Sequence, residues 1–471
     1  MSTDSSASWS AIILAAGEGT RMKSKRPKVL HEIAGRALLC WVVQAALDAG
    51  ASRCLVVVGH GRNDVERELL SRFGDRVEMV LQPHQRGTGD AVRCAMESDS
   101  ALTGRLLVLY GDCPLIPAAL LRNLIDQSEQ AGADLGLVTA RLSDPTGYGR
   151  IVRNAAGRVQ RIVEDRDCSS DQRHIEEVNP GLYAMESGFL RASIAQLTPD
   201  NAQAQLYLTD VVELAAKQGE VVDLEGDMTE LTGVNDQRDL ALAAATRRRL
   251  MAENLARSGV VITDLDALYV DAECEIEPGA QLGANVHLRG RCVVRAGARI
   301  DVGCVLTNVL VDRDANVLPY TVAADSTIGE GAQVGPFSHM RPDTRLGPRS
   351  KVGNFSETKK TTLGAGSKVN HLSYVGNGEI GEGVNIGAGT IFCNYDGEMK
   401  HTTVLEDGVF IGSDTQIIAP VTIARGAYVA SGTTVTRDVP ADALAMSRTK
   451  QENKEGYAAR LRARLRAKKK T

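Results

Sequence analysis

The chain has 471 residues, enough for two or three domains, and a net charge of -5 that gives no reason to expect nucleic acid or a membrane as a partner. No apolar run approaches the roughly 20 residues of a membrane span, and residues 1–6 lack the features of a signal peptide. The nine cysteines are odd in number and contain no Cys-x-x-Cys pair. We therefore expect a cytoplasmic protein with free thiols.

Residues 9–235 alternate strand-like and helix-like segments. The apolar runs are Ala11–Ala15, Cys54–Gly59, Val77–Leu81 and Leu106–Tyr110, and the amphipathic stretches are Leu38–Ala49, Asp64–Phe73 and Asp90–Glu97. This alternation predicts a Rossmann-like α/β domain: a mostly parallel sheet covered by helices, with ligands at the carboxyl ends of the strands. We place this domain at residues 1–235.

The first predicted strand runs directly into a glycine-containing loop, residues 14–22, which is followed by Arg26-Pro-Lys28. Backbone N–H groups of such a loop can surround phosphate oxygens, and Arg21 and Lys28 can neutralise charge at a phosphorus centre. The loop is neither a dinucleotide-binding GxGxxG nor a Walker A sequence. Taken alone, it favours an ordinary tight turn with two solvated cations.

Two further segments add nucleotide chemistry. Gln82–Gly89 offers amide, glycine and hydroxyl groups that suit the carbonyl and N–H groups of uracil. Tyr110-Gly-Asp-Cys-Pro114 ends the most apolar strand with Asp112, whose carboxylate can hold Mg²⁺ over a triphosphate. Asp112 can equally cap the following turn, and the residue alone does not decide between the two.

Residues 236–258 predict a long helix that joins two halves of the chain. Asp236 or Asp239 is the candidate N-cap, and Ser258-Gly259 ends the run. The predicted apolar stripe consists of Leu240, Ala244, Leu250 and Leu255. We interpret Arg247-Arg248-Arg249 as a solvated face.

Residues 259–471 carry a repeat in which an aliphatic side chain returns every sixth position. The repeat comprises Ile276, Leu282, Leu288, Val294, Ile300 and Leu306, then Ile328, Val334, Met340, Leu346 and Val352, and finally Ile411, Ile417, Ile423, Val429 and Val435. A helix repeats at about 3.6 residues and a strand at about 2, so neither explains this period. It is typical of a hexapeptide-repeat parallel β-helix, in which each short strand points one side chain into a prism.

The six-residue count slips between Val352 and Leu363 and again between Ile386 and Ile411. Departures from a repeat mark loops that can carry a site. Here the chain gathers polar side chains instead of small ones: Arg341, Lys359, Lys360, His371, Tyr374, Asn385, Asn394, Tyr395 and Lys400. The sequence therefore predicts a second site on the solenoid.

The loop 14–22 with Lys28, the Gln-rich segment and Gly-Asp-Cys-Pro resemble a sugar-1-phosphate nucleotidylyltransferase. With the hexapeptide half, the resemblance extends over essentially the whole chain to the bifunctional bacterial N-acetylglucosamine-1-phosphate uridylyltransferase/glucosamine-1-phosphate N-acetyltransferases. It implies acetylation of glucosamine-1-phosphate by acetyl-CoA, followed by in-line attack of the sugar phosphate on UTP with Mg²⁺. It also implies a left-handed β-helix and a homotrimer that shares its acetyl sites between subunits.

For uridylyl transfer, the resemblance implies that Arg21 and Lys28 serve catalysis and that Asp112 and Asn235 share the metal. The residues expected to contact UTP or the UDP-sugar are Leu14, Ala15, Gly17, Lys28, Gln82, Gln85, Gly87, Thr88, Tyr110, Gly111, Asp112, Gly149, Glu164, Asn179, Thr209 and Asn235. The chain departs from the family pattern at Pro180, which removes a backbone donor beside Asn179.

For acetyl transfer, imidazole titrates in the range that deprotonation of an amine needs, so His371 is the candidate general base. The resemblance implies Glu357 as its candidate orienting partner. By the resemblance, Arg341, Lys359, Tyr374 and Asn385 bind glucosamine-1-phosphate, and Asn394, Tyr395, Lys400, Ser413, Ser431 and Arg448 bind acetyl-CoA. We expect direct transfer rather than an acetyl-thiol intermediate on Cys393. A lone histidine in a repeat protein is more often a bystander, but the surrounding cations and amides favour function.

Two alternatives remain open. The chain can be a nucleotidylyltransferase alone, with the β-helix as an oligomerisation or regulatory module, or a non-catalytic assembly protein. His371 with Arg341 argues against the first alternative, and Asp112 with Lys28 argues against the second. We interpret the basic segment 460–470 as a frayed, solvated end.

Overall fold

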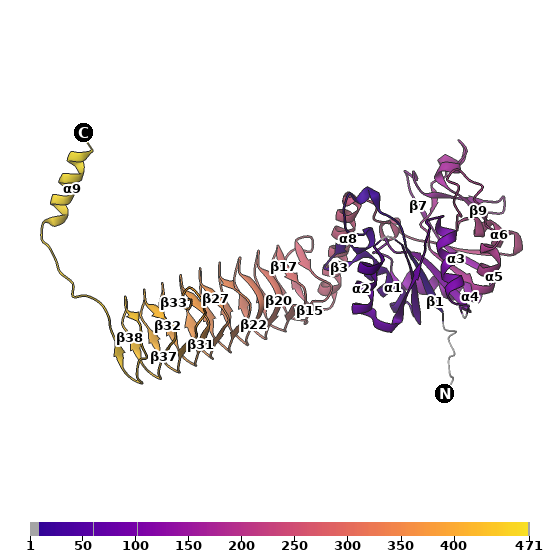
Figure 1. Ribbon diagram of the computed structural model, residues 1–471. Coiled ribbons are helices and arrows are strands. Elements are labelled where there is room, and N and C mark those ends of the chain that lie inside the picture. Colours follow the sequence, from indigo (N-terminus) through magenta and orange to yellow (C-terminus); the bar gives the residue numbers. More distant parts are fainter. Residues whose placement is uncertain (1–8, 60, 101, 470–471) are drawn as a thin grey trace, which may run out of the picture. The chain divides into compact units, whose positions relative to one another are not determined.

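The computed structural model describes residues 9–59, 61–100 and 102–469. These residues form two compact units, one up to Leu250 and the other from Met251, whose elements are labelled in Figure 1. Residues 1–6, on which the expectation about a signal peptide rests, lie outside the described residues, as does Lys470. Within the described ranges, none of the helices has both the length and the apolar composition of a membrane span.

A ten-stranded mixed sheet forms the centre of the first unit, in the order β5-β4-β1-β6-β11-β7-β10-β8-β9, with β12 beside β7. The strands β1, β4, β5 and β6 are parallel to one another, and β11 is antiparallel to both of its neighbours. The four predicted strands are confirmed as this parallel part. The strands are β1 (Ser10–Ala15), β4 (Arg53–Val58), β5 (Val77–Leu81), β6 (Arg105–Tyr110), β7 (Leu135–Arg141), β8 (Gly149–Arg153), β9 (Val159–Val163), β10 (Glu177–Asn179), β11 (Tyr183–Glu186) and β12 (Val221–Glu225), while β2 (Glu32–Ile33) and β3 (Arg36–Ala37) form a separate pair.

Helices cover both faces of this sheet, as the alternating pattern predicted. Successive side chains of β1 show why: Ala11 and Ile13 pack in one core cluster and Ile12 in another. A strand buried on both faces has an uninterrupted apolar sequence. The helices packed in the first cluster are α1 (Leu38–Asp48), α2 (Arg62–Phe73) and α4 (Ala118–Gln130), and those packed in the second are α3 (Thr88–Ser98), α5 (Ser187–Ile194) and α6 (Asp210–Gln218).

The predicted long helix is α8 (Gln237–Arg257), which follows the short α7 (Met228–Leu231). The N–H of Asp239 donates to Oδ1 of Asp236 at 2.9 Å, so Asp236 is the N-cap. Leu240 and Ala244 pack against a small core cluster of the first unit. Leu255 packs against the core of the second unit, so the apolar stripe serves different cores at the two ends of the helix.

The interpretation of Arg247 as a solvated residue was wrong. Its guanidinium carbon lies 4.1 Å from the centroid of the Trp41 ring, and it donates a hydrogen bond to the carbonyl of Pro114. Burial lowers the pKa of Arg247 to about 10. The Trp41 ring and the Pro114 carbonyl hold this guanidinium in place. The charge pattern of the helix alone predicts that it is solvated.

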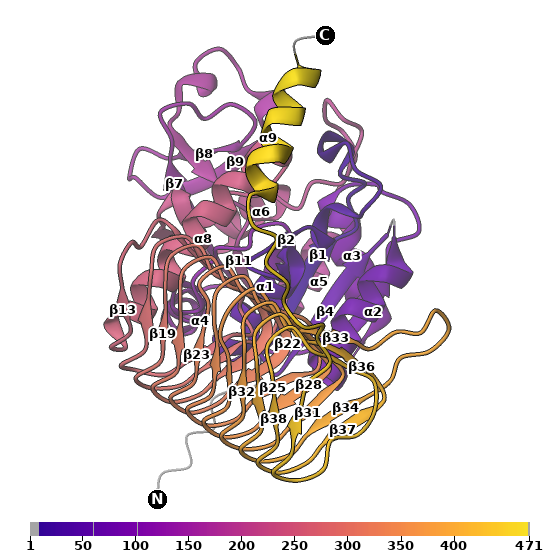
Figure 2. The same cartoon turned by 90° about the vertical axis from the view of Figure 1, so that its left-hand side faces the viewer.

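The second unit is a parallel β-helix whose coils have three faces, seen along the coils in Figure 2. The first face holds β13 (Val261–Ile262), β16 (Gln281–Leu282), β19 (Arg299–Ile300), β21 (Asn316–Val317), β23 (Gln333–Val334), β26 (Lys351–Val352), β29 (Lys368–Val369), β32 (Asn385–Ile386), β35 (Phe410–Ile411), β38 (Tyr428–Val429) and β40 (Leu444–Ala445). The second holds β14 (Leu268–Val270), β17 (Val286–Arg289), β24 (His339–Met340), β27 (Glu357–Lys359), β30 (Tyr374–Gly376), β33 (Ile391–Cys393), β36 (Gln416–Ile418) and β39 (Thr434–Val435). The third holds β15 (Glu275–Ile276), β18 (Val293–Val294), β25 (Thr344–Leu346), β28 (Thr361–Leu363), β31 (Gly378–Ile380), β34 (Thr403–Leu405) and β37 (Val421–Ile423), and β20 (Val305–Val311) and β22 (Val322–Ile328) run through the second and third faces.

The six-residue repeat fills the interior of this prism, as predicted. From Leu282 onward, every residue of the series is at most 4 % exposed, and the partly buried Ile276 packs against the same core. Each strand therefore contributes an aliphatic side chain to one continuous core.

The basic tail differs from its prediction. Residues that we interpreted as frayed belong to helix α9 (Tyr457–Lys468), although the side chains of this helix are exposed, as expected. Its Ala, Leu and Arg residues have high helix propensity, so the segment forms a helix without burying a face.

Candidate active sites

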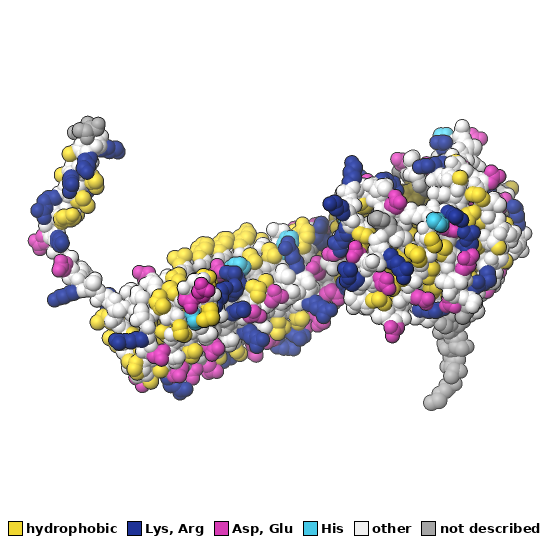
Figure 3. Space-filling model, in the orientation of Figure 1, with side chains coloured by type: hydrophobic (Ala, Val, Ile, Leu, Met, Phe, Trp, Pro, Cys, Tyr) yellow, Lys and Arg dark blue, Asp and Glu magenta, His cyan; other side chains and the backbone are white. Residues whose placement is uncertain are grey.

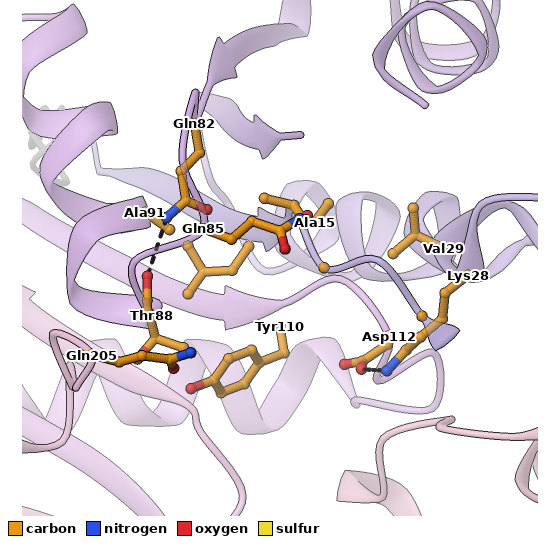
Figure 4. A pocket seen from close by; sticks show the side chains of 15 residues that line it. Ala15, Lys28, Val29, Gln82, Gln85, Thr88, Ala91, Tyr110, Asp112 and Gln205 are labelled. Atoms are coloured by element: carbon orange, nitrogen blue, oxygen red, sulfur yellow. Dashed lines mark hydrogen bonds and ion pairs between the residues drawn. The ribbon is translucent and has the colours of Figure 1, made fainter. Parts of the chain in front are cut away.

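A cavity of about 260 Å³ opens in the first unit where β1, β5 and β6 end. Figure 4 shows Lys28 and Asp112 pointing toward each other at one end of it, with Gln82, Gln85 and Thr88 farther along. The cavity is lined by Leu14, Ala15, Ala16, Gly17, Gly19, Lys28, Val29, Gln82, Gln85, Gly87, Thr88, Ala91, Tyr110, Asp112 and Gln205. Most of the predicted nucleotide contacts therefore lie around one space at the carboxyl ends of parallel strands.

Side-chain hydrogen bonds hold the Gln-rich segment in place. Nε2 of Gln82 donates to Oδ2 of Asp90 at 2.8 Å and to the carbonyl of Gly87 at 3.2 Å. Nε2 of Gln85 donates to the carbonyl of Ala16 at 2.6 Å, which ties this segment to the loop after β1. The amide oxygens are thereby left as acceptors, the groups that the N–H of a uracil ring requires.

A second cavity, of about 320 Å³, shares Tyr110 and Asp112 with the first. It is lined by Arg21, Tyr110, Asp112, Cys113, Thr146, Gly147, Tyr148, Gly149, Glu164, Asn179, Pro180, Leu231, Gly233 and Asn235. The residues expected at the sugar thus surround a space that adjoins the first cavity. Sequence reasoning missed Gln205 in the first cavity and Thr146 in the second, because they lie in connecting segments that match no motif.

Two predicted contacts line neither cavity. The N–H of Gly111 donates to the carbonyl of Leu14 at 2.9 Å, so Gly111 contacts strand β1 and does not line either cavity. Oγ1 of Thr209 donates to Oε1 of Glu164 at 3.0 Å, so Thr209 contacts a residue that lines the second cavity. Burial raises the pKa of Glu164, and the bond from Thr209 partly offsets that rise.

Pro180 leaves its neighbour Asn179 well held. The N–H of Gly181 donates to Oδ1 of Asn179 at 3.1 Å, and Nδ2 of Asn179 donates to the hydroxyl of Tyr183 at 2.7 Å. Because the bond to Oδ1 comes from residue 181, the donor missing at Pro180 is not needed to orient the Asn179 side chain.

Oppositely charged and polar groups meet at the edge shared by the two cavities. Nζ of Lys28 forms an ion pair with Asp112 and donates to Oδ1 of Asn235 at 3.2 Å, and Nη2 of Arg21 donates to the same oxygen at 2.8 Å. The N–H of Val234 donates to the carbonyl of Asp112 at 2.9 Å, which holds the two segments together.

This junction fits a hard divalent cation. The carboxylate of Asp112 and the amide oxygen of Asn235 both reach the Lys28 ammonium, so one small volume is accessible to both oxygens. Across the residues described, no group of three or more His, Cys, Asp or Glu side chains could hold a metal. An ion such as Mg²⁺ that takes one or two protein oxygens and completes its shell with phosphate and water suits this pair.

In the second unit, His371 and two serines stack at one corner of the coils. This first corner, between the first and second faces, contains Asn354, His371, Ser413 and Ser431. The N–H of Gly389 donates to the carbonyl of His371 at 3.2 Å, and that of Asp414 donates to the carbonyl of Ala388 at 2.8 Å.

The corner also holds a predicted acetyl-CoA contact from the end of the solenoid. Nη1 of Arg448 donates to the carbonyl of Ser431 at 3.2 Å, and the N–H of Gly432 donates to that of Ser413 at 2.9 Å. The side chain of His371 is exposed, not packed among the aliphatic core residues. The predicted base therefore shares one surface with Ser413, Ser431 and Arg448.

The orienting partner of His371 differs from the prediction. Nδ1 of His371 is hydrogen-bonded to Oδ1 of Asn354, whereas Oε1 of Glu357 accepts from Nη1 of Arg341 at 2.8 Å. An amide oxygen only accepts, so Nδ1 carries the proton and Nε2 of neutral His371 is free to act as a base. The partner comes from the preceding coil, 17 residues earlier. Only the stacking of coils brings this pair together.

Three cations gather at the second corner, where the chain leaves the second face. Lys400 and then Arg341 lower the pKa of Lys359, because neighbouring positive charges disfavour its protonated form. Glu357 forms an ion pair with Arg341 at this corner. Positive charge held this closely fits a phosphate group.

The acetyl-transfer residues of one chain do not all converge. The first and second corners lie at opposite ends of β27 and β30, about 10 Å apart at three residues per strand. Asn385 lies on the first face, in register with Lys368 and Phe410. Burial raises the pKa of Cys393, which disfavours its nucleophilic thiolate and agrees with direct transfer.

Asn394 is largely buried, and a hydrogen bond holds its side-chain amide in place. Its Nδ2 donates to Oδ1 of Asn377 at 2.8 Å, and Asn394 is only 5 % exposed. Asn377 was missed by sequence reasoning, because it precedes the second slip in the repeat and has no charge to mark it.

Comparisons with known proteins agree with this two-part structure. Residues 11–200 match the family model of the MobA-like NTP transferase domain, and residues 402–437 match the bacterial transferase hexapeptide repeat. The chain is 55 % identical to the bifunctional protein GlmU of Sorangium cellulosum (strain So ce56) over 460 residues, which is 97 % of each chain. It is 45 % identical to GlmU of Trichlorobacter lovleyi, over 96 % of this chain and 98 % of that one, and 43 % identical to GlmU of Corynebacterium efficiens, over 97 % and 95 %. The chain therefore belongs to the GlmU family of bifunctional proteins, with a nucleotidyltransferase unit followed by a left-handed hexapeptide β-helix.

Proposed function

We propose that this protein acetylates glucosamine-1-phosphate with acetyl-CoA and then transfers UMP from UTP to the N-acetylglucosamine-1-phosphate, giving UDP-N-acetylglucosamine and pyrophosphate. One observation supports the proposal: a single chain holds two chemically different clusters of polar side chains. The junction of Lys28, Asp112 and Asn235 suits phosphate and metal, whereas exposed His371 with the cations of the solenoid suits acyl transfer to an amino sugar phosphate.

For uridylyl transfer, the sugar phosphate attacks the α-phosphorus of UTP directly, so no protein nucleophile is needed. Gln82 and Gln85 hydrogen-bond to the uracil in the first cavity. Glu164 and Asn179 bind the sugar in the second cavity, which adjoins it. Arg21 and Lys28 neutralise charge on the phosphates as it develops. Asp112 and Asn235 would hold Mg²⁺, which would supply further charge neutralisation on the triphosphate.

For acetyl transfer, Nε2 of His371 accepts the proton that the sugar ammonium loses as nitrogen attacks the thioester. Arg341 and Lys359 hold the sugar phosphate, with Tyr374 and Asn385 at the sugar. The remaining contacts, to acetyl-CoA, are Asn394, Tyr395, Lys400, Ser413, Ser431 and Arg448. The side-chain amides and hydroxyls among them suit the oxygen that becomes anionic in the transition state.

A homotrimer in the cytoplasm, where UTP and acetyl-CoA are available, completes the proposal. Exposed apolar side chains form a ridge along the first corner: Tyr320, Phe337, Phe355 and Leu372, each at least 50 % exposed. The rings of the first three stack with centroids 5.2 and 5.5 Å apart, and hydrophobic side chains run in rows along the solenoid in Figure 3. A neighbouring copy would cover such a ridge and bring a second-corner cluster near a first-corner histidine.

Following two products separately tests the function. The purified protein receives glucosamine-1-phosphate, acetyl-CoA, UTP and Mg²⁺, and free thiol and pyrophosphate are measured in parallel. We expect thiol release without UTP, and pyrophosphate release from N-acetylglucosamine-1-phosphate without acetyl-CoA. Pyrophosphate release with no acetyl transfer under any condition would support the nucleotidylyltransferase-only alternative.

A further inference from the structure

Between β33 and β34 the chain leaves the coil and forms a small hairpin, the extension visible beside β36 in Figure 2. Tyr395 and Lys400 form an antiparallel bridge, and the N–H of His401 donates to the carbonyl of Asn394 at 2.8 Å. The N–H of Asp396 donates to the carbonyl of Met399 at 3.2 Å, which closes the turn. Lys400 therefore stands on the returning strand of a tight loop.

The carboxylate of Asp396 fastens this hairpin from inside. Its Oδ1 accepts from the N–H of Glu398 at 2.8 Å and from that of Met399 at 2.7 Å, and its Oδ2 is bonded to Nε2 of His401. These bonds hold the pKa of Asp396 well below its usual range. One ionised side chain thus joins both ends of the hairpin.

Such fastening is needed because Lys400 lies where other positive charge repels it. Lys400 interacts with Lys359, which is also exposed to the charge of Arg341, and Glu357 forms an ion pair with Arg341. Burial does not hold the hairpin either, since Tyr395 is 59 % and Met399 63 % exposed. Without its internal hydrogen bonds, the hairpin would move Lys400 away from like charges.

We propose that Asp396 is a positioning residue for acetyl transfer: it locks the hairpin so that the Lys400 ammonium stays beside Lys359 and Arg341, ready for the phosphate of glucosamine-1-phosphate. The inference rests on the proposed function and moves Lys400 from the acetyl-CoA contacts to the phosphate contacts. Asp396 itself touches no substrate. Its loss therefore weakens capture of the sugar phosphate more than it slows the chemical step.

The test measures KM and kcat of thiol release in full-length Asp396→Ala, Asp396→Asn and Lys400→Ala variants. Asp396→Ala is expected to raise KM for glucosamine-1-phosphate about tenfold, with smaller changes in kcat and in KM for acetyl-CoA. Asparagine still accepts the two turn N–H groups, so Asp396→Asn should recover most of the loss. Glu379→Ala, at an exposed acid on the third face, is the matched control, and pyrophosphate release from N-acetylglucosamine-1-phosphate and UTP should be unchanged in all variants.

Coupling between the two residues separates positioning from a general loss of structure. If Asp396 acts through Lys400, the double variant Asp396→Ala/Lys400→Ala has the KM of Lys400→Ala alone. The inference is overturned if the two effects multiply, if only KM for acetyl-CoA rises, or if Asp396→Ala is unchanged while Lys400→Ala is impaired. Failure of the proposed function differs, because it would leave no acetyl transfer to measure in the unaltered protein.

Discussion

Nη2 of Arg21 donates to Oδ1 of Asn235 at 2.8 Å, although 214 positions separate the two residues in the chain. Arg21 comes from the loop after β1, and the backbone N–H of Asn235 donates to Oδ2 of Asp239 at 3.0 Å in the first turn of α8. The start of the long helix therefore holds the backbone of Asn235, and the loop after β1 contacts the side-chain oxygen that we place at Mg²⁺.

The first prediction concerns the metal requirement. Asn235→Ala removes one of the two proposed protein oxygens, so the Mg²⁺ concentration for half-maximal pyrophosphate release should rise about tenfold or more. Thiol release should not change. Asn123→Ala, at an exposed asparagine of α4, is the control for loss of an amide elsewhere in the unit. An unchanged Mg²⁺ titration would remove Asn235 from the metal site.

The second prediction concerns Gly87, which has a φ of 110°. A Cβ there would lie 2.5 Å from the carbonyl oxygen of Leu206, so Gly87→Ala must shift the backbone of the nucleotide cavity. We expect KM for UTP to rise at least about tenfold. Gly132 also has a positive φ, of 60°, but no atom lies within 4 Å of the Cβ that Gly132→Ala adds, so this variant should retain normal kinetics. Equal effects of the two variants would show that backbone strain alone is responsible.

The third prediction concerns the partner of His371. Asn354→Ala frees the imidazole to rotate and to change tautomer, so kcat of acetyl transfer should fall about tenfold while KM changes little. Asn354→Asp restores an acceptor and adds a negative charge, which favours the protonated form of the imidazole. The acidic limb of the pH profile of kcat/KM should then move to higher pH, because the base must be deprotonated to act. A profile identical to that of the unaltered protein would exclude contact between residue 354 and the base.

The fourth prediction follows from Glu164, whose pKa burial raises above the ordinary glutamate value. As the pH rises through the interval between these two values, the unfolded chain loses this proton first, so the free energy of unfolding falls. Above the raised pKa, the folded state bears the full cost of desolvating the ionised Glu164 carboxylate. Glutamine has no charge to desolvate and still accepts from Thr209, so Glu164→Gln should be more stable than the unaltered protein above this interval and should lose that advantage below it.

Urea unfolding followed by tryptophan fluorescence at several pH values measures this difference. The chain has two tryptophans, Trp9 and Trp41, both in the first unit, so the signal reports the unit that contains Glu164. Glu129→Gln, at an exposed acid of α4, should show no such dependence on pH. A Glu164→Gln variant that is less stable at every pH would contradict the conclusion that burial of the ionised Glu164 carboxylate destabilises the fold.

Local sequence was enough to predict the elements that position both sites. The strands β1, β4, β5 and β6 are apolar because both of their faces are buried, and the repeat from Leu282 onward marks inward side chains because each coil has the same three faces. Motif residues next to such elements, including Lys28, Gln82 and Asp112, consequently line the first cavity, as their order along the chain indicates.

Contacts between distant segments were beyond such reasoning. Arg247 was predicted to be solvated because its helix is polar there, yet Trp41 and Pro114 come from other parts of the unit. Asn354 meets His371 only because coils stack, whereas the resemblance to the family pointed to Glu357. When the role of a residue depends on a partner in another coil or loop, the sequence around that residue contains no pattern that predicts the role.

The most direct test of two separate catalytic sites is a comparison of Asp112→Ala with His371→Ala, measuring thiol and pyrophosphate release from each variant. Circular dichroism first confirms that both are folded. The account predicts that Asp112→Ala loses pyrophosphate release from UTP and N-acetylglucosamine-1-phosphate while thiol release continues, and that His371→Ala shows the opposite pattern. Loss of both products from either single substitution would contradict it.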